Sequence, residues 1–115
     1  MNAQLCTENW VGQVAVVAAS GDLDMLTAPQ LKDAVDAVLS KEPAGLIIDL
    51  TKVEFLGSAG MQVLMETHNQ TDGAQTRFAV VAEGAATSRP LKITGIADLI
   101  DLFSSLEVAL DNFAA

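Results

Sequence analysis

The sequence is poor in the residues that disulfides and metal sites require. Its 115 residues include one cysteine, Cys6, and one histidine, His68. A single cysteine excludes an intramolecular disulfide. Two roles stay open for Cys6: an ordinary reduced cysteine near a strand, or redox control through an intermolecular disulfide. The chain has no H-E-x-x-H or C-x-x-C spacing, so we expect no metal site and no other cofactor.

Basic residues are also few. The chain has 6 Lys and Arg against 15 Asp and Glu, a formal net charge of −9, and its basic residues are scattered. Proteins that bind nucleic acid cluster Lys and Arg against the phosphates. Direct binding to nucleic acid or to an anionic membrane surface is therefore disfavoured, whereas a basic protein partner is permitted.

Long apolar runs are missing as well. No stretch approaches the ~20 apolar residues of a membrane-spanning helix. The first residues lack the basic start and apolar run of a secretory signal, which predicts a cytoplasmic protein. Half of the residues are nevertheless hydrophobic, enough to bury a core. The length predicts one domain over residues 1–115.

Apolar patterns that change period along the chain predict an α/β fold. Short apolar runs predict strands, and capping signals with helical spacing predict helices. The strands are expected at 5–10, 14–19, 45–50, 77–82 and 99–103, and the helices from about 28 to 39, 58 to 70, 88 to 95 and 106 to 112. The order is β-β-α-β-α-β-α-β-α, which implies a mainly parallel mixed sheet of about five strands flanked by about four helices.

Local signals predict where several of these elements begin and end. Thr27 with Gln30, and Ser104 with Glu107, each form a capping box at the start of a helix. Turn chemistry at 21–22 is expected to end the second strand.

The segment 55–61 is the most unusual part of the chain. It follows the central strand, and functional groups in α/β sheets gather beyond the carboxyl ends of strands. Ser58 has small residues around it. Two interpretations are open: Ser58 caps the next helix through its hydroxyl, or it has a functional role.

Known patterns of serine and phosphate chemistry do not fit this segment. A nucleophile elbow needs glycine two residues before the serine, where this chain has Leu56. His68 lies about 15 Å further along the same helix, at ~1.5 Å per residue, too far to act as a base. We expect it on the inner face of that helix with Met61, Leu64 and Met65. No lysine follows the glycines as in a phosphate loop, so we predict that the protein is not an enzyme.

Three acidic residues, Asp22, Asp24 and Asp49, lie near the predicted strand ends. They form either an acidic corner or a set of separate, solvated turn carboxylates. The residue pattern leaves both possibilities open.

Three ordered blocks of the sequence resemble the STAS domains of bacterial anti-sigma factor antagonists. The first is D-L-T-K-V-E-F-L-G-S-A-G-M at 49–61, and the second is G-D-L-D at 21–24 followed by T-A-P at 27–29. The third is L-K-I-T-G-I at 91–96 with Leu-Phe at 102–103. The resemblance spans roughly residues 10–110 and implies the STAS fold for residues 1–115.

The resemblance implies a partner and a regulatory mechanism. Members of this family bind an anti-sigma factor, usually a serine kinase of the histidine-kinase-like ATPase fold, and thereby release a sigma factor. The kinase phosphorylates the motif serine, which ends the interaction, and a phosphatase restores it. By motif, Ser58 is the phosphoacceptor. The partner surface would comprise Asp22, Asp24, Gly57, Ser58, Ala59 and Met61.

One departure from the family pattern lies beside that serine. The family often has Asp where this chain has Gly57. An alternative function keeps the STAS fold without phosphoregulation: a constitutive scaffold or accessory subunit of a signalling or transport complex, in which Ser58 only caps a helix. The resemblance carries no expectation about oligomeric state.

Overall fold

The computed structural model describes residues 5–114, with side chains up to residue 113. In chain order the elements are β1 (Cys6–Val11), β2 (Val14–Leu23), α1 (Ala28–Leu39), β3 (Gly45–Leu56), α2 (Ser58–Ala74), β4 (Arg77–Val81), α3 (Ser88–Ile93), the 3-10 helix η1 (Ile96–Asp98), β5 (Asp101–Phe103) and α4 (Leu106–Ala114). The predicted order of strands and helices is confirmed, and the 3-10 helix η1 is an element that the sequence pattern did not predict.

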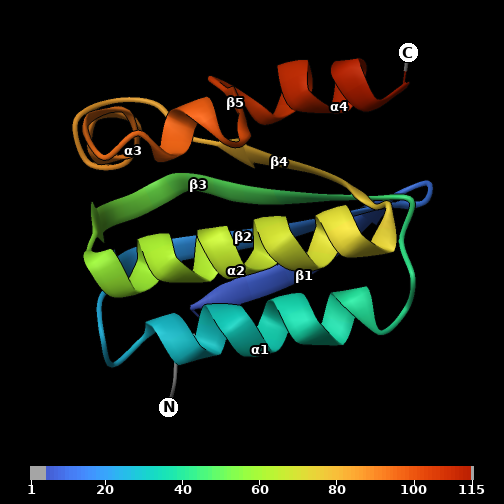
Figure 1. Ribbon diagram of the computed structural model, residues 1–115, viewed down its shortest axis with the longest axis horizontal. Helices are drawn as coiled ribbons and strands as arrows, with labels where there is room; N and C mark the ends of the chain where they lie inside the picture. The colour runs from blue at the N-terminus through green and yellow to red at the C-terminus, as the bar shows by residue number, and fades with distance from the viewer. Residues whose placement is uncertain (1–4, 115) are drawn as a thin grey trace.

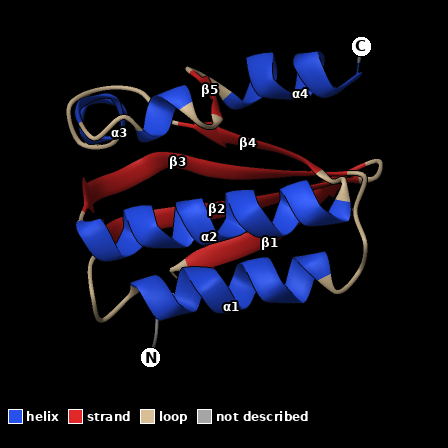
Figure 2. Cartoon of the chain, viewed as in Figure 1, coloured by secondary structure: helices blue, strands red, loops and turns tan. Residues whose placement is uncertain are grey.

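The strands form one sheet in the order β1-β2-β3-β4-β5. The β1–β2 pair is antiparallel, and each later pair is parallel. Helices α1 and α2 lie side by side on one face, and α4 lies on the other (Figures 1 and 2). This confirms the mainly parallel mixed sheet predicted from the alternation of strands and helices. None of the described helices is long and apolar enough to cross a bilayer.

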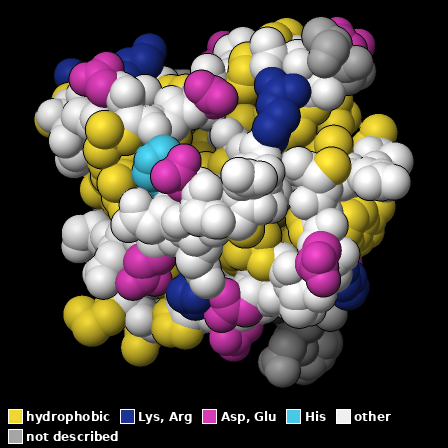
Figure 3. All heavy atoms as spheres, turned by 45° about the vertical axis from the view of Figure 1, so that its right-hand side comes forward, with side chains coloured by type: hydrophobic (Ala, Val, Ile, Leu, Met, Phe, Trp, Pro, Cys, Tyr) yellow, Lys and Arg dark blue, Asp and Glu magenta, His cyan; other side chains and the backbone are white. Residues whose placement is uncertain are grey.

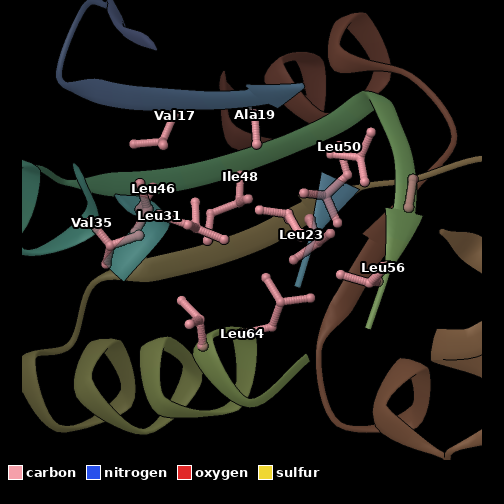
Figure 4. Packing of buried hydrophobic residues seen from close by; sticks show 14 of the residues in the cluster. Val17, Ala19, Leu23, Leu31, Val35, Leu46, Ile48, Leu50, Leu56 and Leu64 are labelled. Atoms are coloured by element: carbon pink, nitrogen blue, oxygen red, sulfur yellow. The ribbon is translucent and has the colours of Figure 1, made fainter. Parts of the chain in front are cut away.

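Alternation along the central strands divides the core between the two faces. Ile48 points toward α1 and α2, where it packs with Leu31 and Leu64 among others (Figure 4). Its neighbour Ile47 points the other way and packs with Ala109 of α4. Both isoleucines are fully buried, each stabilising the fold by about 1.5–3 kcal/mol. Burial on both faces explains why β3 begins as an unbroken apolar run.

The last helix is tied to the amino ends of β3 and β4. A Cβ on Gly45 would lie 2.6 Å from Cε2 of Phe113, so the aromatic ring occupies the space that a side chain would need. The Arg77 guanidinium lies 4.4 Å from the centre of the Phe113 ring, and its Nη2 donates to Asn112 Oδ1 at 2.9 Å. These contacts fix the end of α4 over the sheet.

Two strands run further than the sequence predicts. The 21–22 segment does not end β2: Gly21, at φ +77°, sits in an irregular stretch where the pairing register shifts, and the strand continues to Leu23. Strand β3 continues to Leu56, which pairs with Leu23. The turn that follows each strand therefore begins directly after a buried core residue, Leu23 or Leu56.

One further local prediction is wrong. Helix α4 is capped by Ser105, whose Oγ accepts from the Val108 N–H at 3.2 Å, and not by a Ser104–Glu107 box. The predicted inner face of α2 is confirmed for the fully buried Leu64 and for Met61, which packs against the same core, whereas Met65 is only half-buried. The fully packed residues of α2 are Gly60, Val63, Leu64, Thr67 and Thr71.

Candidate functional site

The turns that follow β2 and β3 lie next to each other at the carboxyl end of the sheet. The Gly57 N–H donates to the Leu23 carbonyl at 2.9 Å, which ties the start of α2 to the end of β2. Between the turns is an open hollow of about 490 Å³, lined by Asp24, Met25, Phe55, Gly57, Ser58, Ala59 and Gln62. We call this the Ser58 hollow.

Ser58 is the first residue of α2 and is exposed. Gly57 occupies the N-cap position, and no side chain makes a capping hydrogen bond to the first turn. Of the two interpretations that the sequence left open for Ser58, a helix cap is therefore excluded. The N–H groups of the first turn are left to solvent or to a ligand, and they carry the positive end of the helix dipole.

Two glycines shape this turn through close packing. A Cβ on Gly57 would lie 3.0 Å from Cε2 of Phe55 and 3.3 Å from the Leu23 carbonyl oxygen. A Cβ on Gly60 would lie 2.8 Å from Cδ1 of Leu56 and 3.0 Å from Cβ of Leu23. The Phe55 ring therefore lies against position 57, where the resemblance described above leads to the expectation of an aspartate. The first turn of α2 rests directly on the ends of both strands.

The turn from β2 into α1 is held by Asp24 and Thr27. Asp24 Oδ1 accepts from the backbone N–H of Leu26 at 3.0 Å and of Thr27 at 3.1 Å. The Thr27 hydroxyl accepts from the Asp24 N–H at 2.9 Å, and its Oγ1 lies within donating distance of the Asp22 carbonyl oxygen at 2.6 Å and of Asp24 Oδ1 at 3.1 Å. Thr27 is thus the N-cap by position, but its side chain forms no capping box with Gln30.

These hydrogen bonds also set the ionisation of Asp24. The Thr27 hydroxyl, and then the backbone N–H groups of Thr27 and Leu26, hold the pKa of the Asp24 carboxyl below its usual value. Asp24 therefore lines the Ser58 hollow as a charged group whose oxygen is already engaged by its own turn.

Sequence reasoning missed the apolar side chains around Ser58. Met25 is 81% exposed, Leu26 85% and Phe55 52%. Hydrophobic side chains protrude from the surface at the lower left of Figure 3. The available signal was a pair of large apolar residues between Asp24 and Thr27, in a segment too short to bury them.

The other predicted partner residues are distributed around the hollow. Asp22 is exposed and pairs in register with Phe55. Ala59 lines the hollow, whereas Met61 turns toward the end of α3, with its Sδ 3.9 Å from Thr94 Oγ1. Asp22, Asp24, Gly57, Ser58 and Ala59 are brought together, and Met61 marks the margin.

Asp49 lies elsewhere. It lines a second hollow, beside α4, with Thr7, Thr51 and Lys52 among others, and its Oδ1 accepts from the Thr51 N–H at 2.9 Å. An acidic corner of Asp22, Asp24 and Asp49 is therefore not formed. The longer course of β3 separates Asp49 from the turn at which the strand ends.

The single histidine and the single cysteine lie outside the Ser58 hollow. His68 lines a separate hollow with residues of β4 and β5. Burial raises the pKa of the half-buried Cys6 thiol to about 11, so little thiolate exists at neutral pH and redox control is disfavoured. Across residues 5–113, no group of three or more His, Cys, Asp and Glu side chains converges as metal ligands would.

Comparison with known proteins gives consistent matches. The STAS domain family matches residues 10–109. The anti-sigma-F factor antagonist RsfB of Mycobacterium tuberculosis is 41% identical over 97 residues, which is 84% of this chain and 79% of that protein.

Solved structures agree with this match. An anti-sigma factor antagonist from Mycobacterium paratuberculosis is similar with a TM-score of 0.90 and 39% identity, over 96% of this chain and 93% of that one. The Bacillus protein SpoIIAA is similar in its unphosphorylated form (TM-score 0.74, 13% identity, 96% of this chain and 98% of that one). Its phosphorylated form is similar too (TM-score 0.72, 14% identity, 94% and 98%). At that identity the SpoIIAA comparison shows the fold alone.

Proposed function

The chain belongs to the STAS domain family, and on that premise we propose that it is an anti-sigma factor antagonist whose binding is ended by phosphorylation of Ser58. It acts by occupying a partner's surface and not by catalysis. The observation that carries the proposal is an exposed serine hydroxyl with no capping role, beside exposed apolar side chains at the carboxyl end of the sheet.

The surroundings of Ser58 favour a protein partner over a small substrate. The hollow is open, and Met25 and Phe55 line it alongside the serine. Clustered exposed apolar side chains with a polar rim are typical of protein–protein contact sites. RsfB, 41% identical over most of this chain, is named for antagonism of an anti-sigma factor, which supports the same class of partner here.

The fold is expected to tolerate the phosphate. A phosphoserine adds about −1.5 to −2 charges at neutral pH. The uncapped first turn of α2 offers N–H groups and the positive end of the helix dipole, which stabilise an anion there. SpoIIAA, a protein of this fold, is described in both forms, as expected of a fold that survives the modification.

Phosphorylation would act on the interface. The phosphate would enter the same hollow as Met25 and Phe55, where an apolar partner group would otherwise be buried. Burying an unpaired charge in an apolar contact is costly, so the phosphate weakens binding at the apolar centre of the interface. The complex is lost while the antagonist stays folded.

The partner that best fits this switch is an anti-sigma factor that is itself a serine kinase, and a phosphatase would reverse the reaction. Gly57 places no carboxylate directly before Ser58. In this proposal the kinase's own residues would hold its magnesium ion and accept the proton of the Ser58 hydroxyl.

The proposal is tested by measuring affinity with wild type, Ser58→Ala and Ser58→Glu. The probes are the anti-sigma-F factor of M. tuberculosis and the anti-sigma kinases of the organism that carries this chain, with calorimetry as the readout. Ser40→Glu is the matched control, because it adds the same charge at the opposite end of α1. Incubation with kinase and ATP, followed by intact-mass analysis, tests the modification directly.

We expect wild type, Ser58→Ala and Ser40→Glu to bind one kinase, and Ser58→Glu and the phosphoprotein not to bind it. Equal binding by Ser58→Glu and wild type, with no phosphate gained, would leave a constitutive scaffold as the function. Failure of wild type to bind any anti-sigma factor would refute the antagonist function itself.

A further inference from the structure

We propose that Met25 and Leu26, presented by the Asp24–Thr27 turn, carry most of the affinity for the anti-sigma factor. In this proposal the partner offers an apolar pocket with a basic rim. The inference rests on the function proposed above and divides its surface into an affinity element and a switch element. Ser58 decides whether the complex forms, and the Met25–Leu26 pair decides how tightly.

The first observation is exposure. Met25 and Leu26 are 81% and 85% exposed, the highest values among the large hydrophobic side chains that the structure describes. They stand next to each other in the chain, and the half-exposed Phe55 near the end of β3 lines the same hollow as Met25. Scattered apolar residues are ordinary on a surface, but an adjoining set of large ones marks a contact site.

The second observation is rigidity. The N–H of Leu26 and of Thr27 both donate to Asp24 Oδ1, and the Thr27 hydroxyl closes the turn onto the Asp22 carbonyl. The Thr27 and Ala28 N–H groups also donate to the Asp24 carbonyl, at 3.2 and 2.8 Å. The backbone is thus fixed on both sides of the exposed pair. A preorganised loop loses little conformational freedom on binding, which raises the affinity that its apolar contacts yield.

The third observation is continuity with the switch. Met25 lines the Ser58 hollow, so a partner that covers Ser58 also covers Met25. Burial of large apolar anchors at the centre of an interface supplies most of the binding energy in many complexes. The serine hydroxyl next to them contributes little until it carries a phosphate.

Charge identifies the rim of the partner. No Lys or Arg lines the hollow. Asp24 lines the hollow, and the exposed Asp22 lies beside Phe55 in the sheet. An apolar pocket bordered by Lys or Arg complements this arrangement, and opposite charges at a rim raise the association rate more than the affinity.

The test compares Met25→Ala, Leu26→Ala and their double variant with Leu99→Ala. Leu99 is 55% exposed and lines the His68 hollow, so it is a matched control away from Ser58. The probe is the anti-sigma factor that wild type binds, measured by surface plasmon resonance at several salt concentrations. We expect the double variant to bind about 30-fold or more weakly, through faster dissociation, with Leu99→Ala unchanged. The wild-type association rate should fall as salt rises.

Outcomes separate this inference from the proposed function. If wild type binds and Ser58→Glu does not, but the double alanine variant binds like wild type, the affinity element is wrong and the switch stands. An equal loss of affinity for Leu99→Ala would also overturn the proposed role of Met25 and Leu26, as would an association rate that is insensitive to salt. If wild type binds no anti-sigma factor, both proposals fail. Circular dichroism checks folding, and Met25→Gln with Leu26→Gln repeats the test should the alanine pair not fold.

Discussion

Two turns at the same end of the sheet lead from a strand into a helix, and they are built differently. The turn from β2 into α1 is held by side-chain hydrogen bonds from Asp24 and Thr27. The turn from β3 into α2 has no side-chain cap and is held by backbone packing, with Gly60 against Leu23 and Leu56. Polar side chains are therefore committed to structure in the first turn, whereas Ser58 in the second turn remains free for chemistry.

The difference separates stability from function along the chain. In the β2–α1 turn the polar residues stabilise the fold, and the apolar residues between them are exposed. In the β3–α2 turn the small residues stabilise the fold, and the polar residue is exposed. In the β2–α1 turn, replacing the polar residues should therefore lower the free energy of unfolding. In the β3–α2 turn, replacing the packed Gly60 should lower it, whereas replacing the exposed Ser58 should change it little.

The largest effect on stability is expected for Gly60→Ala. Its new Cβ would meet Leu56 and Leu23 at 2.8 and 3.0 Å, and overpacking of this kind costs about 1–3 kcal/mol. Gly73→Ala is the control in the same helix, because nothing lies within 4 Å of its added Cβ and helix propensity favours alanine by about 1 kcal/mol. Urea denaturation should show opposite signs for the two variants. Equal stabilisation by both would mean that the second turn is not held by packing.

Thr27→Val should come next. The substitution keeps the shape but removes the hydroxyl that bonds the Asp22 carbonyl and the Asp24 N–H, at a cost of about 1–2 kcal/mol. Thr7→Val, on the exposed strand β1, is the matched control and should shift stability by less than about 0.5 kcal/mol. Equal midpoints for both variants in urea would contradict a structural role for the Thr27 hydroxyl.

The contribution of Asp24 should depend on pH. Its folded pKa lies below its ordinary value of 3.8, so the ionised form is the one stabilised by folding. That stabilisation is complete above the ordinary value and is lost as the pH falls through the lower folded value. Asp24→Ala should therefore melt at a lower temperature than wild type at pH 7. The difference in melting temperature between wild type and Asp24→Ala should narrow at acidic pH. Asp24→Asn should melt between wild type and Asp24→Ala. A gap that stays constant from pH 7 to pH 2 would exclude a role for the charge.

The smallest effect is expected for Ser58→Ala. Because the hydroxyl caps nothing, stability should change by less than about 0.5 kcal/mol. Ser58→Asp should be neutral or slightly stabilising, by about 0.3–1 kcal/mol, through the helix dipole. Thermal melts at low and high salt would show the dipole effect weakening with salt. A loss above about 1 kcal/mol in Ser58→Ala would restore the capping interpretation.

Much of this architecture could be predicted from the sequence, because apolar periodicity depends on which faces are buried. The unbroken run at 45–50 indicated a strand covered on both sides, and Ser58 was singled out because it follows that strand. The position of the serine depends only on chain order and sheet direction, both of which the sequence encodes locally.

Hydrogen-bond partners could not be predicted in the same way. Thr27 has the spacing of a capping box, but β2 runs on to Leu23 and brings the Asp22 carbonyl within reach of its hydroxyl. Ser105 lies next to Ser104, and only the path of the chain decides which of them caps α4. Met25 and Leu26 are of residue types usually found in a core. They are exposed because they lie in the turn that Asp24 and Thr27 hold. Each of these outcomes depends on tertiary geometry.

Because no capping bond of the folded protein depends on the side chain at position 58, selection for stability is weak there. A lineage can gain or lose a modifiable hydroxyl in one substitution without a compensating change elsewhere. Asp24 and Thr27 are joined by hydrogen bonds, so a change in one affects the other. The side chains of Met25 and Leu26 between them take no part in these bonds and can change without disturbing the turn. After gene duplication, the partner contacts proposed at 25 and 26 and the regulation proposed at 58 would therefore be able to evolve as independent traits.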